Sequence, residues 1–120
     1  MARIFNLLIL VCSFMNAQPQ LYDFSYDGDN RQYYLYTPES LEAGAALIFV
    51  FHGYSGSAAS IMGYSDLNDL ADQSGFVVCY PQGLIDDWDY RFWNVGYEFH
   101  SNETHDDVGF VKALAYYLQV

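Results

Sequence analysis

Residues 45–56 read Ala-Ala-Leu-Ile-Phe-Val-Phe-His-Gly-Tyr-Ser-Gly, a continuous apolar run that ends abruptly at a His-Gly pair. Such a run, bounded by turn residues, is typical of a buried parallel strand that is covered on both faces. The glycines let the chain bend tightly where the strand stops. Ligands of open α/β sheets bind outside the carboxyl ends of the strands, so we expect a functional site at this turn.

Before this strand, the sequence predicts a β-hairpin. Residues 21–26 and 31–36 have the alternating pattern of strands, and residues 27–30, Asp-Gly-Asp-Asn, tolerate positive φ. Pro38 is expected to close the second strand, because proline cannot donate a hydrogen bond to a sheet.

After the His-Gly turn, the pattern predicts a helix. Ser65 offers an N-cap, Leu67, Leu70 and Ala71 follow at helical spacing, and Gly75 ends the helix.

The second half of the chain predicts another strand and another helix. Residues 76–80 form a short apolar run that Pro81 stops. Residues 82–105 are a long connection rich in aromatic side chains, which favours an ordered loop packed beside a site. Asp106 and Asp107 are expected to open the last helix as cap and dipole partners. The order hairpin, strand, helix, strand, helix predicts a single α/β domain.

The net charge and the N-terminal residues indicate which partners to exclude and where the protein is located. The net charge of -11 argues against nucleic acid and anionic membrane surfaces as partners. Residues 1–17 read as a secretory signal peptide with Ala17 at the cleavage point, so we expect residues 18–120 to be secreted or periplasmic. Cys79 is then a lone cysteine, predicted to be a buried apolar side chain.

A set of short motifs in a fixed order carries a resemblance to a known family. The motifs are Arg31-Gln-Tyr-Tyr-Leu-Tyr-Thr-Pro38, Phe51-His-Gly-Tyr-Ser-Gly-Ser-Ala58, Leu70-Ala-Asp, Gly75-Phe-Val-Val-Cys-Tyr-Pro-Gln-Gly83, Trp93-Asn94 and Asp106-Asp-Val-Gly-Phe-Val111. In this order they resemble the secreted polyhydroxybutyrate depolymerase and feruloyl esterase group of α/β-hydrolases. The resemblance covers residues 18–120 and implies the N-terminal half of that fold, interrupted before the nucleophile elbow.

The resemblance also implies roles for individual residues. The Tyr54 backbone N–H would contribute to an oxyanion hole, and His52 and Gly53 would support this oxyanion loop. Trp88 and Trp93 would either line a substrate pocket or pack the long loop over the core. The family's Gly-x-Ser-x-Gly elbow is absent from residues 1–120. We therefore expect a fragment of a serine ester hydrolase that is inactive by itself, with no cofactor and no metal.

A rival interpretation builds a small esterase within this chain around Ser55. Its acid would be one of three aspartates and its base one of two histidines, namely Asp86, Asp87, Asp89, His100 and His105. Under the main interpretation the three aspartates form a solvated acidic loop.

The expected partners follow from the family. A full-length protein would act on esters of the polyester or hydroxycinnamoyl-polysaccharide class. The alternative from another class is a non-catalytic polymer- or carbohydrate-binding piece that uses the aromatic side chains of residues 80–97. The 120-residue chain itself is expected to self-associate, because the apolar strand over residues 45–51 would be left as a sheet edge.

Overall fold

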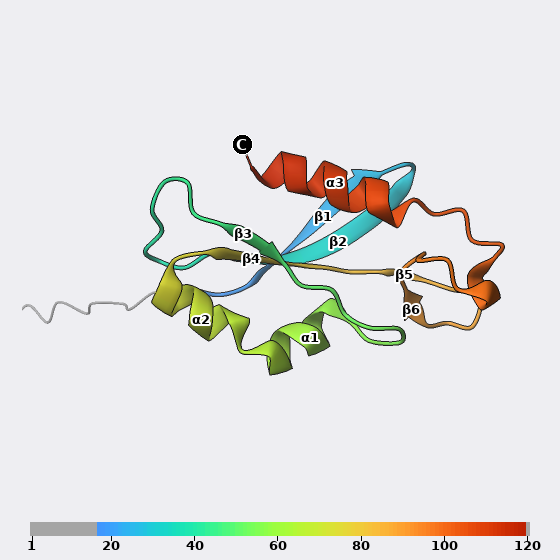
Figure 1. Ribbon diagram of the computed structural model, residues 1–120, viewed down its shortest axis with the longest axis horizontal. Helices are drawn as coiled ribbons and strands as arrows, with labels where there is room; N and C mark the ends of the chain where they lie inside the picture. Colours follow the sequence, from blue (N-terminus) through green and yellow to red (C-terminus); the bar gives the residue numbers. More distant parts are fainter. Residues whose placement is uncertain (1–16, 120) are drawn as a thin grey trace, which may run out of the picture.

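The computed structural model describes residues 17–119 of the chain (Figure 1). The predicted signal peptide therefore lies outside the described residues, apart from Ala17. Over the described range, no helix has the length and apolar character needed to cross a membrane.

The described chain contains a mixed sheet, a small ribbon and several helices. The elements are β1 Gln20–Tyr26, β2 Asp29–Tyr36, β3 Leu47–Phe49, α1 Ala58–Ser65, α2 Leu67–Ser74, β4 Val77–Pro81, β5 Leu84–Ile85, β6 Arg91–Phe92, the 3₁₀ helix η1 Glu98–His100 and α3 Asp107–Leu118. The four-stranded sheet has the order β1-β2-β4-β3, and β5 pairs with β6 in a separate ribbon.

The predicted hairpin is confirmed, with a tighter turn than expected. Tyr26 pairs with Asp29, so the turn consists of Asp27 and Gly28 alone. Their φ angles are 50° and 85°. Positive φ at both central positions gives a turn whose twist matches that of the flanking strands. Asp29 and Asn30 therefore belong to β2 rather than to the turn.

The strand predicted over residues 76–80 is confirmed as β4, at the centre of the sheet, but it includes Pro81, which was expected to stop it. It runs antiparallel to β2 and parallel to β3. Val78, Cys79 and Tyr80 are fully buried. Because β4 has a strand on each side and helices over both faces, its apolar run has no polar alternation.

The prediction for residues 45–51 is wrong in extent and in burial. The strand β3 includes only Leu47–Phe49. Ile48 and Phe51 are 36% and 43% exposed. Within residues 17–119, β3 pairs with β4 alone and lies at the edge of the sheet. One side of the strand therefore has no neighbour to bury it.

The region between β3 and β4 holds two helices where the sequence pattern predicted one. The hydroxyls of Ser57 and Ser60 form a capping box at the start of α1. Asp66, in a left-handed conformation with φ 55°, separates α1 from α2. The predicted cap Ser65 is instead the last residue of α1. Gly75 ends α2 with φ 73°, as predicted.

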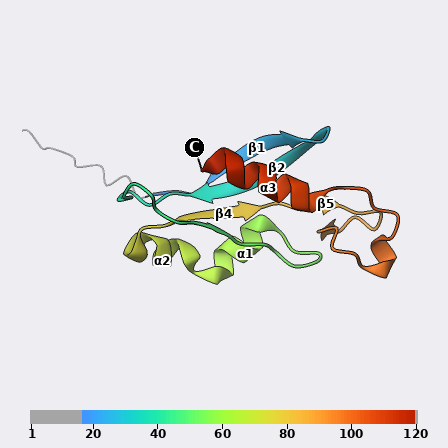
Figure 2. The same ribbon diagram turned by 45° about the horizontal axis from the view of Figure 1, so that its top comes forward.

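Helices cover both faces of the sheet (Figures 1 and 2). On the face of α1 and α2, the buried residues are Tyr36, Ala58, Ala71, Phe76, Val78 and Tyr80. On the face of α3, they are Tyr33, Cys79, Phe110 and Leu114. Successive residues of β4 therefore supply the two cores in turn, as strand geometry requires. The arrangement is consistent with part of an α/β fold.

Candidate functional site

The carboxyl ends of β3 and β4 point toward the end of the molecule where the β5–β6 ribbon and η1 lie (Figure 1). The long connection over residues 82–105 lies there. Within it, β5 and β6 form a short hairpin that contacts the loop after β3 through the Arg91 carbonyl and the Ser55 N–H. The His-Gly turn and the long connection together build the candidate site.

His52 is buried beneath this loop and is fully engaged in hydrogen bonds. Its Nε2 accepts the Gly83 N–H at 2.9 Å, so the ring proton is on Nδ1, which donates to the Gly53 carbonyl at 2.8 Å. Burial lowers the pKa of His52, so the neutral form is favoured. Both ring nitrogens are used to hold the chain, which is the geometry of a positioning role rather than of a general base.

Gly83 is required by this contact. A Cβ at position 83 would collide with the Phe92 carbonyl and press on the His52 ring. The absence of a side chain therefore lets the two loops approach.

The peptide unit between Gly53 and Tyr54 has a fixed orientation. The Gly53 carbonyl accepts hydrogen bonds from His52 Nδ1 and, at 3.0 Å, from the Gly56 N–H. In a planar trans peptide the N–H points opposite to the carbonyl, so the Tyr54 N–H is directed away from the loop. No hydrogen bond within residues 17–119 uses this N–H. The next amide, that of Ser55, donates to the Arg91 carbonyl at 2.8 Å.

The side chain of Tyr54 is held by Asp86. The Tyr54 hydroxyl donates to Asp86 Oδ2 at 2.8 Å. Partial burial and this contact raise the pKa of Tyr54 to about 12. The prediction that the aspartates form a solvated loop is therefore wrong for Asp86, which is 7% exposed, whereas Asp87 and Asp89 are exposed.

Asp86 remains ionised although it is buried. Burial alone would raise its pKa, but hydrogen bonds from His100, from the Tyr90 N–H, from the Tyr54 hydroxyl and from the Trp88 N–H lower it to about 2. His100 Nε2 donates at 2.9 Å. The Trp88 N–H and the Tyr90 N–H donate to Asp86 Oδ1 at 3.0 Å and 2.9 Å, respectively.

The two tryptophans predicted for substrate binding lie in different places. The Trp93 indole N–H donates to the His52 carbonyl at 2.9 Å. Its ring lines a cavity of about 200 Å³ together with His52, Gly53, Tyr54, Val95 and Tyr97. Trp88 is in the hairpin turn, 56% exposed, with its ring near those of Phe99 and His100. The structure brings Trp93 to the loop and leaves Trp88 outside the cavity.

A second, larger hollow shares Trp93 and Val95 with this cavity. It has a volume of about 460 Å³ and runs between Phe51 and the α3 residues Val108 and Val111. Its walls are mostly apolar. The hollow therefore lies between Phe51, which follows β3, and the first turns of α3.

The rival triad around Ser55 is only partly assembled. Asp86 and His100 form a pair, but His100 is buried and its Nδ1 has no partner among the described residues. The Ser55 hydroxyl makes no hydrogen bond to either histidine within residues 17–119. His105 pairs instead with Asp29, from the start of β2, at 3.0 Å.

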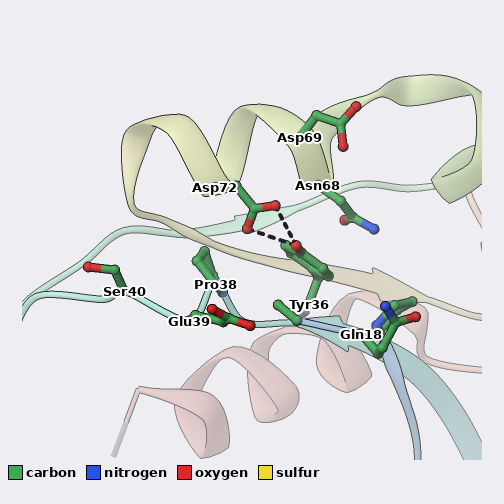
Figure 3. Close-up of a pocket in the computed structure, with 10 residues that line it drawn as sticks. Gln18, Tyr36, Pro38, Glu39, Ser40, Asn68, Asp69 and Asp72 are labelled. Atoms are coloured by element: carbon green, nitrogen blue, oxygen red, sulfur yellow. Dashed lines mark hydrogen bonds between the residues drawn. The ribbon is translucent and has the colours of Figure 1, made fainter. Parts of the chain in front are cut away.

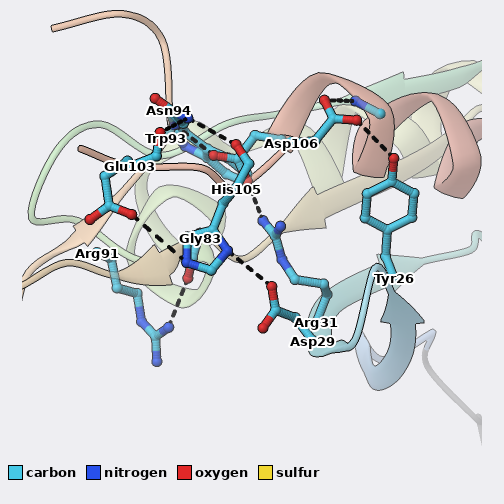
Figure 4. A network of polar contacts seen from close by, with 12 residues as sticks. Tyr26, Asp29, Arg31, Gly83, Arg91, Trp93, Asn94, Glu103, His105 and Asp106 are labelled. Atoms are coloured by element: carbon cyan, nitrogen blue, oxygen red, sulfur yellow. Dashed lines mark hydrogen bonds and ion pairs between the residues drawn. The ribbon is translucent and has the colours of Figure 1, made fainter. Parts of the chain in front are cut away.

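A buried ion pair between Arg31 and Asp107 anchors the long connection to the sheet; Arg31 is labelled in Figure 4. Arg31 of β2 donates to Asp107 Oδ1 at 2.6 Å, and the Asn94 N–H donates to Asp107 Oδ2 at 2.6 Å. The Arg31 guanidinium also lies 3.9 Å from the centre of the Phe110 ring. Asp106 caps α3 through the Gly109 N–H, as predicted. Asp107 is not only a dipole partner, because it bridges the loop and the hairpin.

A separate polar hollow lies between the end of β2 and α2 (Figure 3). There the Tyr36 hydroxyl donates to both oxygens of Asp72 at 2.7 Å. Burial, and then Asp72, raise the pKa of Tyr36 to about 12. Its lining includes Glu39 and Asp69, so it is acidic. It is built from residues other than those of the His-Gly turn.

Sequence reasoning missed several residues that build the site. The sequence places Asp86 in a solvated loop or in the rival triad, His100 in the rival triad alone, and Gly83 within a motif without a role of its own. Their roles depend on contacts between segments far apart in the chain. A weak signal was present, since Asp86 lies among turn residues that need an acceptor for free amides.

Comparison with known proteins gives partial matches to esterases, and no protein-family model matches the chain. The chain is 31% identical over 78 residues to feruloyl esterase B of Talaromyces stipitatus, covering 65% of this chain and 22% of that protein. It is 33% identical over 67 residues to feruloyl esterase B of Talaromyces funiculosus, covering 56% and 19%. It is 27% identical over 96 residues to acetylxylan esterase A of Emericella nidulans, covering 80% and 30%.

Among solved structures, an acetyl xylan esterase from Aspergillus awamori superposes with a TM-score of 0.47 and 27% identity, over 56% of this chain and 26% of that chain. The chain spans less than a third of the length of the curated relatives that it matches. The polyhydroxybutyrate depolymerase part of the expected family stays a prediction. The sequence similarity supports the esterase part: over part of its length, this chain is similar to feruloyl and acetylxylan esterases.

Proposed function

We propose that this chain supplies the oxyanion-binding part of a secreted serine carboxylic-ester hydrolase. The observation that carries the proposal is the Tyr54 N–H, which is directed away from its own loop and is not used by any hydrogen bond within residues 17–119. It lies at the carboxyl end of β3, beside a cavity lined by Trp93. Partial sequence similarity to feruloyl and acetylxylan esterases supports the choice of esters as substrates.

The chemistry assigned to this N–H is electrostatic. When a nucleophile attacks an ester carbonyl, the carbonyl oxygen becomes negatively charged in the tetrahedral intermediate. A backbone donor that is already aimed at this oxygen stabilises it by about 2.7–4 kcal/mol. The nucleophile, its acid and its base would come from a part of the full-length protein that these residues do not include. Polyesters and hydroxycinnamoyl-polysaccharide esters are the proposed substrate classes.

The test is substitution of Tyr54 in a longer polypeptide that contains this segment and hydrolyses esters. Tyr54→Pro removes the N–H, so kcat should fall about 100-fold or more. Tyr54→Ala keeps the N–H and is the matched control, with a smaller loss expected. Circular dichroism of both variants checks that they fold. Equal kcat values for two folded variants would contradict the role of the Tyr54 N–H.

A second candidate function is polymer binding without catalysis, favoured by the exposed rings around the ribbon. Trp88, Tyr90, Tyr97 and Phe99 are each about half exposed. Such rings can stack on the faces of sugar units. Co-sedimentation of the chain with insoluble xylan tests this function, with Trp88→Ala as the variant and Tyr116→Ala, on α3, as the control. Retention that is lost only in Trp88→Ala would favour it.

A further inference from the structure

We infer that Asp86 is a positioning residue that holds the oxyanion loop through the Tyr54 hydroxyl. The contact joins the hairpin turn between β5 and β6 to the loop after β3, which are far apart in the chain. The inference rests on the proposed function for its effect on rate.

Residues in and next to the β5–β6 hairpin form hydrogen bonds to the loop after β3, both before and after Tyr54. Before Tyr54, the Gly83 N–H donates to His52 Nε2, and the Trp93 indole N–H donates to the His52 carbonyl. After Tyr54, the Arg91 carbonyl accepts the Ser55 N–H. These contacts fix the backbone before and after Tyr54. The Asp86 contact fixes the side chain between them.

Asp86 is suited to this role because several hydrogen bonds hold its own carboxylate in place. Its Oδ1 accepts the Trp88 and Tyr90 N–H groups, which closes the hairpin turn. Its Oδ2 accepts from His100 of η1 and from the Tyr54 hydroxyl. The carboxylate therefore joins the turn, η1 and the oxyanion loop. A rigid acceptor holds its donor more tightly than a mobile one.

The ring of Tyr54 transmits this constraint to the main chain. It packs edge-on against the rings of Tyr90, Phe99 and His100 at centroid distances of 5.8, 5.5 and 5.6 Å. With the hydroxyl fixed at the far end, rotation about χ1 is restricted. The Cα of Tyr54, and so the direction of its N–H, is held from the side-chain end as well.

The test uses hydrogen exchange of the 120-residue chain, followed by mass spectrometry of its peptides. Tyr54→Phe removes only the hydroxyl and leaves the turn contacts of Asp86 in place. Asp87→Asn is the control, because Asp87 is an exposed carboxylate in the same turn. In Tyr54→Phe we expect the amides of residues 53–57 to exchange about tenfold faster or more. Exchange of the β4 peptide, residues 77–81, should be unchanged.

The outcomes separate this inference from the proposed function. Unchanged exchange at residues 53–57 in Tyr54→Phe would overturn it, and so would a uniform increase that includes β4. In a longer polypeptide that hydrolyses esters, Tyr54→Phe should lower kcat several-fold and leave KM unchanged. A loss confined to KM would also overturn it. A different result would contradict the proposed function: kcat of the Tyr54→Pro variant would then be retained.

Discussion

At the scale of single residues, buried charges decide how the long connection is attached. Arg31 and Asp107 are almost completely buried, and Asp107 also accepts the Asn94 N–H. A buried ion pair is not by itself strong stabilisation, but losing one partner leaves an uncompensated charge. These residues should therefore be sensitive to single substitutions and tolerant of paired ones.

Arg31→Met should lower the free energy of unfolding by about 3–5 kcal/mol, because it leaves the Asp107 carboxylate buried without its cation. Adding Asp107→Asn removes that charge and keeps an acceptor for the Asn94 N–H, so the double variant should be more stable than Arg31→Met. Urea unfolding followed by circular dichroism measures both. Losses that simply add would contradict this account.

Asp86 should make stability depend on pH in the acid range. Its pKa in the folded protein, about 2, is below the ordinary value of an aspartate, 3.8. The stabilisation is therefore present above about pH 4 and is lost as the pH falls toward 2. Urea unfolding at several pH values should show that the free energies of unfolding of wild type and Asp86→Asn converge between about pH 4 and pH 2. Asp87→Asn is the control. A constant difference from pH 7 to pH 2.5 would rule out the assignment.

At the scale of elements, β3 is the least protected part of the sheet. In the described chain it pairs only with β4, and it carries no charge or proline. Unpaired apolar edges invite pairing with another chain. The structure also shows which position can accept a charge: Leu47 and Phe49 pack against the core under α3, whereas Ile48 is 36% exposed.

We expect the 120-residue chain to self-associate through β3, and Ile48→Lys to reduce this association. The lysine places a charge on the edge without entering the α3 core. Tyr116→Lys, on the exposed face of α3, adds the same charge elsewhere and is the matched control. Size-exclusion chromatography with light scattering distinguishes the variants. A monodisperse, monomeric wild-type chain would show that the β3 edge does not cause self-association.

At the scale of the whole molecule, residues 17–119 leave the Tyr54 N–H without a hydrogen bond and do not join Ser55 to a histidine. The Asp86–His100 pair is buried, and the Ser55 hydroxyl is not joined to it within residues 17–119. Under the proposed function, the nucleophile and its base would therefore be groups other than Ser55 and His100.

The purified 120-residue chain should not hydrolyse short p-nitrophenyl esters above the rate of a denatured control. The Gly-x-Ser-x-Gly sequence is absent from it. Labelling with a serine-reactive fluorophosphonate provides a second measurement. Saturable turnover or labelling that disappears in Ser55→Ala would establish the rival triad instead.

Sequence alone determined the elements whose signals are local. The hairpin over residues 21–36, the apolar run of β4, the Gly75 helix end and the Asp106 cap each follow from the conformational or hydrogen-bonding preference of a few adjacent residues. The oxyanion loop was expected from motifs, and its role stays a proposal.

Only the tertiary structure decided the rest. The shortness of β3 depends on its edge position, and the break at Asp66 depends on a left-handed residue between two helical segments. The burial of Asp86 depends on donors from the hairpin turn, from η1 and from Tyr54 in the loop after β3. A carboxylate is buried where enough donors converge, and convergence of distant segments is a property of the fold rather than of the local sequence.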